Sequence, residues 1–282
     1  MGGGSYSYLS ASSRAYDRSS KSINEIFTAR SMNQKLNIKD KIRECKDSDE
    51  HPNTVPIIIA LDVTGSMGRI PENLIKGGFA EIMNSIYEAG VVDPQVCFLG
   101  IGDAVYDDAP LQVAQFETSD QTLDEWLESM WIEGGGGGND SEGYILSWYF
   151  ASRHTDCDAI NKRNQKGILI TIGDEYVTPK LTKRQIEDIF GDSVQGDIEH
   201  EDLYNEVSVN WNVYHISMSY NNNMSNKLKQ SWNFMGDNHI MINRDPNNAI
   251  ESIVNIVRLN NTTTLVETPN VVDTKEELSE IL

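Results

Sequence analysis

The feature that most constrains the fold is a series of short apolar runs that alternate with helical patterns. The clearest runs span residues 55–61, 96–101, 167–172, 211–218 and 239–242. Strands that are apolar throughout are typical of a sheet covered on both faces. Strands and helices in alternation favour a mostly parallel arrangement. The sequence therefore predicts an α/β fold with a doubly wound sheet.

The intervening segments carry helix signals. Pro71 and Gly90 bracket one helix, which is the usual placement of these residues near helix starts and ends. Residues 123–131 place apolar side chains at i, i+3, i+4, i+7 and i+8, which predicts a second. Residues 111–117 alternate only roughly after Pro110, as expected of an edge strand. We therefore expect six strands, one of them an antiparallel edge strand, with helices on both faces.

The chain has 282 residues, and its composition does not divide the middle. We expect one domain over residues 55–260 with two extensions. Residues 1–54 form a basic, partly disordered arm: residues 1–20 are rich in Gly, Ser and Tyr and should be disordered when unbound, and residues 22–35 should form a short helix. Residues 261–282 form an acidic tail.

Charge is distributed unevenly along the chain, whose net charge is −20. Residues 1–46 hold nine Lys and Arg against four Asp and Glu, so the remainder holds 14 against 39. An acidic body repels phosphate backbones, which argues against nucleic-acid binding by the main domain. The basic arm is expected to dock on an acidic partner or on its own body.

The apolar runs are too short to cross a membrane, and no signal peptide opens the sequence, so no membrane partner is expected. The three cysteines, Cys45, Cys97 and Cys157, are odd in number and scattered. Cys97 lies within an apolar run and is expected to be a small core residue. A reducing, cytoplasmic location is the expectation, and the oligomeric state is left open.

The first apolar run ends in Asp62-Val63-Thr64-Gly65-Ser66, directly ahead of a predicted helix. A tight turn from strand to helix points the oxygens of Asp62, Thr64 and Ser66 at one place, and helix-start N–H groups face the same way. Oxygen-only donors suit a hard divalent cation such as Mg²⁺ or Mn²⁺ better than Zn²⁺.

Further carboxylates follow other predicted strands. Asp103 follows the second strand, Asp174 follows the run at 167–172, and a glycine run at 134–138 leads into Asn139 and Asp140. In parallel α/β sheets, sites lie at the carboxyl ends of the strands near the topological switch point. These loops are therefore expected to converge with Asp62.

The three segments resemble the metal-ion-dependent adhesion site (MIDAS) of von Willebrand factor A (VWA) domains. The family motif D-x-S-x-S corresponds to Asp62, Thr64 and Ser66, its loop Thr aligns with Asn139, and its later Asp with Asp174. The resemblance covers roughly residues 55–259 and implies a Rossmann-like VWA fold. The implied metal-site residues are Asp62, Thr64, Ser66, Asn139, Asp140 and Asp174, with Asp103, Glu142 and Glu175 around them.

The resemblance implies a binding module rather than an enzyme. In the family two hydroxyls bind the metal directly, while carboxylates hold coordinated water. The ion, here Mg²⁺ with Mn²⁺ or Ca²⁺ as alternatives, accepts an Asp or Glu carboxylate from a protein partner. The expected role is an adaptor or assembly factor. If Asp140 rather than Asn139 coordinates directly, the metal is partly neutralised and partner affinity should fall.

Two alternatives stay open: a metal-dependent phosphohydrolase using the same acidic cleft, and a structural component of an assembly with a vestigial site. A haloacid-type phosphatase needs a second Asp where Thr64 stands. The glycine run is followed by no Lys-Ser/Thr pair and lacks G-x-G-x-x-G spacing, so it is not a phosphate or dinucleotide loop. His215, inside a strand, is expected to be a core residue.

Overall fold

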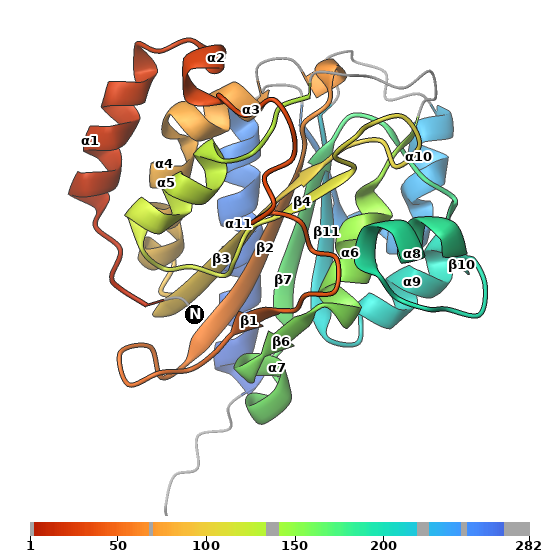
Figure 1. The fold of residues 1–282 in the computed structure, drawn as a ribbon. Coiled ribbons are helices and arrows are strands. Elements are labelled where there is room, and N and C mark those ends of the chain that lie inside the picture. The colour runs from red at the N-terminus through yellow and green to blue at the C-terminus, as the bar shows by residue number, and fades with distance from the viewer. Residues whose placement is uncertain (1–2, 68–69, 134–140, 219–225, 244–246, 268–282) are drawn as a thin grey trace, which may run out of the picture.

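The protein is built around one six-stranded sheet. The computed structural model describes residues 3–67, 70–133, 141–218, 226–243 and 247–267 (Figure 1). Neighbouring strands are parallel except for β4, which runs antiparallel to β3 at one edge. This confirms the predicted fold class. In spatial order the strands are β12 (Ile240–Asn243), β11 (Trp211–Met218), β7 (Gly167–Gly173), β2 (Thr54–Asp62), β3 (Asp93–Ile101) and β4 (Leu111–Val113).

The strand order places a topological switch point at the centre of the sheet. From β2 the chain moves outward to β3 and β4, then returns to the other side of β2 with β7, β11 and β12. The loops that leave β2 and β7 therefore run in opposite directions across the sheet. A crevice at the carboxyl ends of two such strands is the usual binding position in folds of this type.

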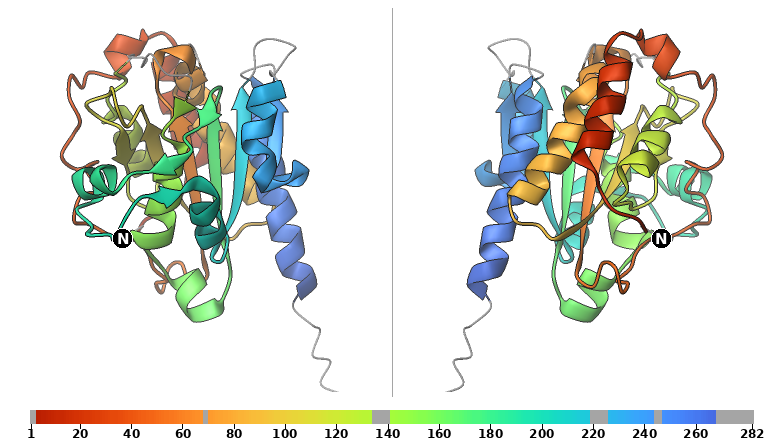
Figure 2. Two further views of the ribbon diagram at one scale, coloured as in Figure 1. Left: turned by 90° about the vertical axis from the view of Figure 1, so that its right-hand side faces the viewer. Right: turned by 90° about the vertical axis from the view of Figure 1, so that its left-hand side faces the viewer.

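Helices cover both faces of the sheet, as Figures 1 and 2 show. One face carries α4 and α5, with α11 packed against α4. The other carries α6, α8, α9 and α10. The main helices are α4 (Phe79–Glu88), α5 (Asp120–Glu128), α6 (Tyr144–Arg153), α7 (Asp158–Arg163), α8 (Lys183–Phe190), α9 (His200–Val207), α10 (Asn226–Trp232) and α11 (Asn247–Glu267).

The unbroken apolar pattern of the strands follows from this double covering. Successive residues of a strand point to opposite faces. On β2, Ile57 and Ile59 enter the core beneath α4 and α11, whereas Ile58 and Ala60 enter the core beneath α6. All four are at most 1% exposed. Both faces of β2 must therefore be apolar.

The helix expected between Pro71 and Gly90 is present but is not uniform. It consists of α3 (Ile70–Asn73), a π-helical segment η2 (Leu74–Gly78) and α4. Gly78 faces α11, where a Cβ atom would lie 2.9 Å from the Ile250 Cδ1 atom. The wider π turn thus coincides with a close approach of two helices that the spacing of apolar residues did not reveal.

The N-terminal arm is more ordered than expected. Residues Tyr8–Ser19 form helix α1, which lies across α4 and α5 (Figures 1 and 2). The prediction that residues 1–20 are disordered is therefore wrong for this segment. The helix expected over residues 22–35 is only the single turn α2 (Ile23–Ile26).

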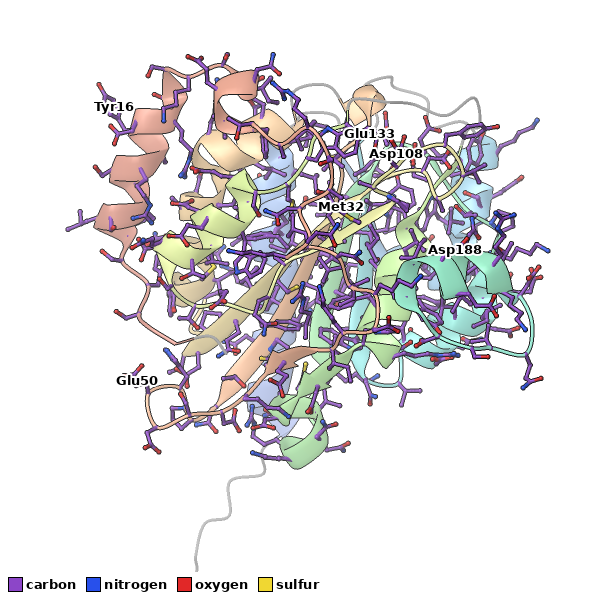
Figure 3. The ribbon with its side chains drawn as sticks, viewed as in Figure 1. Tyr16, Met32, Glu50, Asp108, Glu133 and Asp188 are labelled. Atoms are coloured by element: carbon purple, nitrogen blue, oxygen red, sulfur yellow. The ribbon has the colours of Figure 1, made fainter. Side chains whose placement is uncertain are left out.

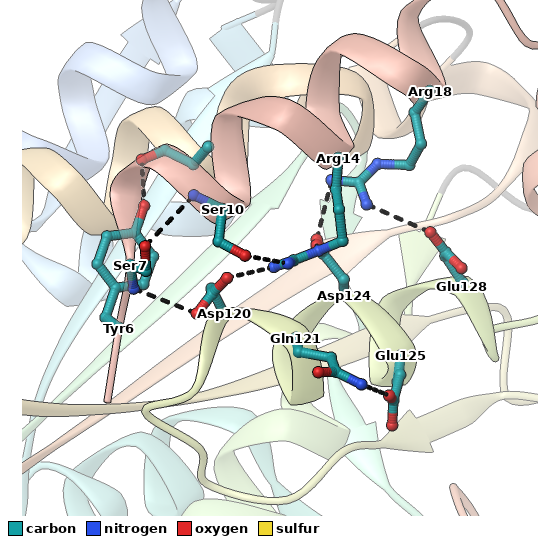
Figure 4. Close-up of polar contacts among 11 residues, drawn as sticks. Tyr6, Ser7, Ser10, Arg14, Arg18, Asp120, Gln121, Asp124, Glu125 and Glu128 are labelled. Carbon is teal, nitrogen blue, oxygen red and sulfur yellow. Dashed lines mark hydrogen bonds and ion pairs between the residues drawn. The ribbon is translucent and has the colours of Figure 1, made fainter. Parts of the chain in front are cut away.

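Ion pairs hold α1 against α5 (Figure 4). Arg14 pairs with Asp120 and Asp124, and Arg18 pairs with Asp124 at 2.9 Å and with Glu128 at 3.3 Å. Arg18 is only 5% exposed, so its pairs are much less screened than surface pairs. The basic arm was expected to dock either on an acidic partner or on the body of the protein itself, and in the structure it docks on the body. Composition alone suggested disorder because these partners are about 100 residues away in sequence.

At the other end, α11 runs to Glu267, past the expected start of the tail at residue 261. The Asn261 side chain donates a 2.9 Å hydrogen bond to the Ala89 carbonyl oxygen at the end of α4. This contact fixes the helix beyond the expected boundary. Within the described part of the chain, no helix has the length and apolar character needed to span a membrane.

Candidate metal centre

Asp62 and Asp174 meet at the switch point. Asp62 is the last residue of β2, and Asp174 directly follows β7. In the parallel register Leu61 of β2 lies beside Ile172 of β7, so the two strands end at the same level. The structure thus brings together two of the predicted site residues from segments more than 100 positions apart in sequence.

The Asp62 carboxylate is fully buried and organises the turn that follows it. Its Oδ1 atom accepts hydrogen bonds from the Thr64 backbone N–H at 2.9 Å and from the Thr64 hydroxyl at 2.6 Å. Its Oδ2 atom accepts a 3.1 Å hydrogen bond from the Tyr144 hydroxyl. The predicted D-x-T arrangement therefore exists as a hydrogen-bonded unit, in which the Thr64 oxygen lies beside the carboxylate.

The pKa of Asp62 is raised to about 7: burial is the main cause and the charge of Asp174 adds to it, while the hydrogen bonds from Thr64 and Tyr144 act in the opposite direction. Asp62 keeps these three donors and still titrates near neutrality, so the described residues provide it with no compensating positive charge. A bound cation would supply one.

Tyr144, the first residue of α6, is a site residue that the sequence did not reveal. It is fully buried, and its hydroxyl oxygen also accepts a 3.3 Å hydrogen bond from the Glu175 backbone N–H. A Cβ atom at Gly173 would lie 1.9 Å from that hydroxyl, so only glycine fits there. Tyr144 thereby links the loop after β7 to Asp62. The only sequence signal was its position two residues after Glu142 at a helix start.

Two further carboxylates are buried beside Asp62. Glu142 is 4% exposed and Asp103 is 2% exposed. Among the described residues, Oε2 of Glu142 and Oδ2 of Asp103 have no hydrogen-bond partner. Burial raises the pKa of Glu142 to about 9, and the charges of Asp62 and Asp103 contribute next. Buried polar atoms are normally satisfied, so two orphaned carboxylate oxygens in one acidic cluster indicate an absent positive partner.

Glycines bring Glu142 and Asp103 together. A Cβ atom at Gly143 would lie 2.7 Å from the Gly102 carbonyl oxygen, so the start of α6 packs directly on the end of β3. Glu142 belongs to β5 (Ser141–Glu142), which pairs with β8 (Tyr176–Val177) after the Asp174 loop. The backbone therefore places Glu142 next to the loop that carries Asp174.

The loop after β3 is held by its own carboxylates. Oδ1 of Asp103 accepts hydrogen bonds from the backbone N–H groups of Val105 and Tyr106, and Oδ2 of Asp107 accepts one from the Asp103 N–H. Asp108 is exposed, and its backbone N–H donates a 3.2 Å hydrogen bond to Glu133 (Figure 3 labels both). Asp103 is therefore buried in the acidic cluster formed with Asp62 and Glu142, whereas Asp108 lies at the protein surface.

Not every predicted site residue can be placed. The backbone of Ser66 lies in the short 3-10 helix η1 (Gly65–Met67), and its side chain is outside the described part of the structure. Asn139 and Asp140 also lie outside the described residues. Asp174 and Glu175 are half-buried, and the Glu175 carbonyl oxygen accepts a 3.3 Å hydrogen bond from the Trp232 indole.

The donor set fits a hard divalent cation. It consists of carboxylate and hydroxyl oxygens, and every charged group that shifts the pKa of Glu142 is itself acidic. Among the described residues, no three His, Cys, Asp or Glu side chains are grouped closely enough to hold a metal by themselves.

An aromatic layer lies beneath the acidic cluster. His215 on β11 stacks on Trp232 with ring centroids 3.7 Å apart, and Tyr144 contacts both rings edge-on or tilted. The Thr171 hydroxyl donates to the Tyr214 carbonyl oxygen, so we assign the proton to Nδ1 of His215, which donates to Thr171 at 2.9 Å. Burial lowers the pKa of His215 to about 3. His215 is a neutral core residue, as predicted.

Comparison with known proteins supports the fold. Neither a protein-family model nor a curated protein sequence matches the chain. Among solved structures, the pilus adhesin SpaC from Lactobacillus rhamnosus GG in its open conformation aligns with a TM-score of 0.52 and 14% identity. A second structure of this adhesin gives 0.50 and 12% identity over 77% of this chain and 32% of that chain. Proximal thread matrix protein 1 from the mussel byssus, described with a zinc-occupied MIDAS motif, gives 0.46 and 12% identity over 76% of this chain and 48% of that chain.

The alignment with the open adhesin covers 77% of this chain but only 31% of the adhesin. At such low identity the likeness concerns the fold alone. It agrees with the VWA-like Rossmann arrangement that the sequence predicted, in which a mostly parallel six-stranded sheet is covered by helices on both faces.

Proposed function

We propose that the chain is a VWA-type protein-binding module in which Asp62, Thr64 and Asp174 hold a divalent cation. The cation accepts an Asp or Glu carboxylate from a protein partner. The observation that carries this proposal is the cluster of buried carboxyl groups at the switch point, where Glu142 and Asp103 each leave a side-chain oxygen without a partner among the described residues. The VWA-like fold supports it.

The residues present define what each would contribute. The Thr64 hydroxyl would be a neutral ligand. It donates a hydrogen bond to Oδ1 of Asp62, which orients the hydroxyl oxygen. Tyr144 donates to the other oxygen of Asp62 and fixes the carboxylate plane. A bound Mg²⁺ or Mn²⁺ would supply the electrophilic position for the partner carboxylate, and few anionic direct ligands would keep it electrophilic.

Calorimetric titration of Mg²⁺ and Mn²⁺ tests the metal site. Asp62→Ala and Thr64→Ala should each weaken binding by about 10- to 100-fold. Matched controls are Thr182→Ala, the N-cap of α8, and Asp197→Ala, which pairs with Lys180 on the surface. Both controls should bind metal as the wild type does. Equal affinity of all four variants would refute the site.

The partner chemistry needs a second measurement. Two sets of immobilised peptides are compared, one with Asp or Glu and a matched one with Asn or Gln at the same positions. Only the acidic peptides should retain the protein, and only in Mn²⁺, not in chelator. Retention in chelator would place recognition elsewhere. Hydrolysis of a generic phosphoester that is lost in Asp62→Ala would instead support the phosphohydrolase alternative. Asn139→Ala compared with Asp140→Asn would show which residue completes the metal site.

A further inference from the structure

The N-terminal arm is joined to the body through a small second sheet that contains two of the three cysteines. Strand β1 (Arg43–Cys45) pairs in parallel with β6 (Thr155–Cys157), and in this register Cys45 lies beside Cys157. This pairing could not be predicted from the sequence, because the two residues are more than 100 positions apart. Both thiols are free in the structure and at most 1% exposed.

The backbone geometry suits a disulfide. Neighbouring strands lie about 4.7–4.9 Å apart, and register partners project to the same face. Disulfides join residues whose Cα atoms are about 4.4–6.8 Å apart. Burial and the neighbouring Cys157 thiol both raise the pKa of Cys45, as expected of two adjacent thiols. The register of the two cysteines is therefore one that a disulfide can span.

A polar network on both sides of the pair fixes this register. Ahead of it, the Arg43 backbone N–H donates a 2.9 Å hydrogen bond to the His154 carbonyl oxygen. After it, Lys46 pairs with Asp158 at 3.3 Å, and the Asp47 backbone N–H donates to the Asp158 carboxylate at 3.1 Å. The two thiols are thus kept adjacent by contacts that do not involve sulfur.

Arg163 strengthens the same joint from α7. It forms an ion pair with Asp47 and donates a 2.6 Å hydrogen bond to the Thr54 carbonyl oxygen at the start of β2. The segment around Cys45 is therefore tied to the body at several points. A fixed arrangement of two thiols gives a high effective concentration and favours a stable disulfide.

We propose that Cys45 and Cys157 form a disulfide site that cross-links the N-terminal arm to the body of the protein under oxidising conditions. The oxidant is a small disulfide such as glutathione disulfide. The thiolate of one cysteine attacks a sulfur of glutathione disulfide, which releases one glutathione and leaves a mixed disulfide. The second cysteine then attacks the protein sulfur of that mixed disulfide and releases the second glutathione. The two cysteine protons are taken up by the two departing thiolates, and two electrons pass to glutathione.

The burial of both thiols makes the exchange depend on local opening of the three-residue strand β1. In a reducing cytoplasm the glutathione pool would keep the pair as thiols, and in an oxidising compartment the cross-link would persist. The link would fix the end of the arm at Cys45 to β6 of the body.

The test equilibrates the full chain in glutathione redox buffers, both from the native state and during refolding, where burial does not limit access. After the remaining thiols are alkylated, peptide mass mapping should identify a Cys45–Cys157 cross-link in the wild type and in Cys97→Ala. Cys97 is a matched control, since it is also buried but its register partner on β2 is Ile58. Cys45→Ala and Cys157→Ala should yield no internal cross-link.

Oxidation of the wild type should raise the melting temperature by roughly 10 °C, because the bond closes a loop of about 100 residues in the unfolded chain. The same treatment should leave Cys157→Ala unchanged. Absence of the Cys45–Cys157 peptide after both routes, or a cross-link that involves Cys97, would overturn the proposal. A cross-link that forms only during refolding and lowers the melting temperature would also contradict the geometry on which it rests.

Discussion

Replacing Asp62 by Asn should stabilise the metal-free protein while abolishing its metal site. The folded protein holds the pKa of Asp62 at about 7, mainly through burial, against 3.8 for an unstructured aspartate. Each pH unit of difference corresponds to about 1.4 kcal/mol, so ionised Asp62 costs the metal-free fold about 4 kcal/mol above pH 7. Asn is neutral and nearly the same shape.

Asn keeps most of the hydrogen bonds. Its side-chain oxygen can still accept from the Thr64 N–H and hydroxyl, but its NH₂ group replaces the oxygen that accepts from Tyr144. This loss costs about 1 kcal/mol. The net gain from Asp62→Asn is therefore about 3 kcal/mol in the free energy of unfolding at pH 8.

The pH dependence gives the prediction a sign that can be checked. Because the folded-state pKa is raised, the folded protein binds more protons than the unfolded chain between about pH 4 and 7. The destabilisation from Asp62 is absent below that range and complete above it. The advantage of the Asn variant should thus be close to zero at pH 4 and reach its full value at pH 8.

Urea unfolding in chelator, monitored at both pH values, measures this difference. Asp158→Asn is the control, because Asp158 is also buried, at 3% exposure, but is paired with cationic side chains. Burial disfavours its charge, yet hydrogen bonds from Lys162, the Asp47 N–H and Lys46 hold its pKa below the usual range. That variant should be less stable than the wild type at pH 8. If Asp62→Asn is also destabilised at pH 8, or if its effect does not change with pH, the reasoning about the acidic cluster is wrong.

Saturating Mg²⁺ or Mn²⁺ should raise the melting temperature of the wild type by roughly 5–10 °C but leave Thr64→Ala unchanged in differential scanning calorimetry. The double variant Arg14→Gln/Arg18→Gln should lose about 1–3 kcal/mol and expose α1 to faster proteolysis within residues 1–20, whereas unaltered cleavage would mean that the ion pairs do not hold it. Burial lowers the pKa of His215 to about 3 from 6.5. Below pH 6.5 the unfolded chain therefore binds a proton at this histidine that the folded protein does not, and the free energy of unfolding falls. Urea unfolding should therefore show about 2 kcal/mol of this loss at pH 5 in the wild type and none of it in His215→Phe, which keeps a ring on Trp232.

The sequence predicted the layers of the sheet because burial on both faces leaves a local signature. Every residue of β2 after Val55 must be apolar until the strand reaches the site at Asp62, and this run is visible without any knowledge of the partners. The positions of Asp62 and Asp174 at strand ends followed from the same pattern. Their meeting followed from the general rule that parallel strands end at one edge.

The tertiary structure alone decided the features that depend on distant partners. Helix α1 (Tyr8–Ser19) lies on α5 because Asp120, Asp124 and Glu128 face Arg14 and Arg18, and no local pattern could supply those charges. Tyr144 reaches Asp62 only because Gly173 leaves space for its ring. The pairing of Cys45 with Cys157 likewise depends on a register between strands more than 100 residues apart. Burial and turn formation leave patterns among neighbouring residues and can be predicted from the sequence, whereas contacts between remote segments exist only after the chain has folded.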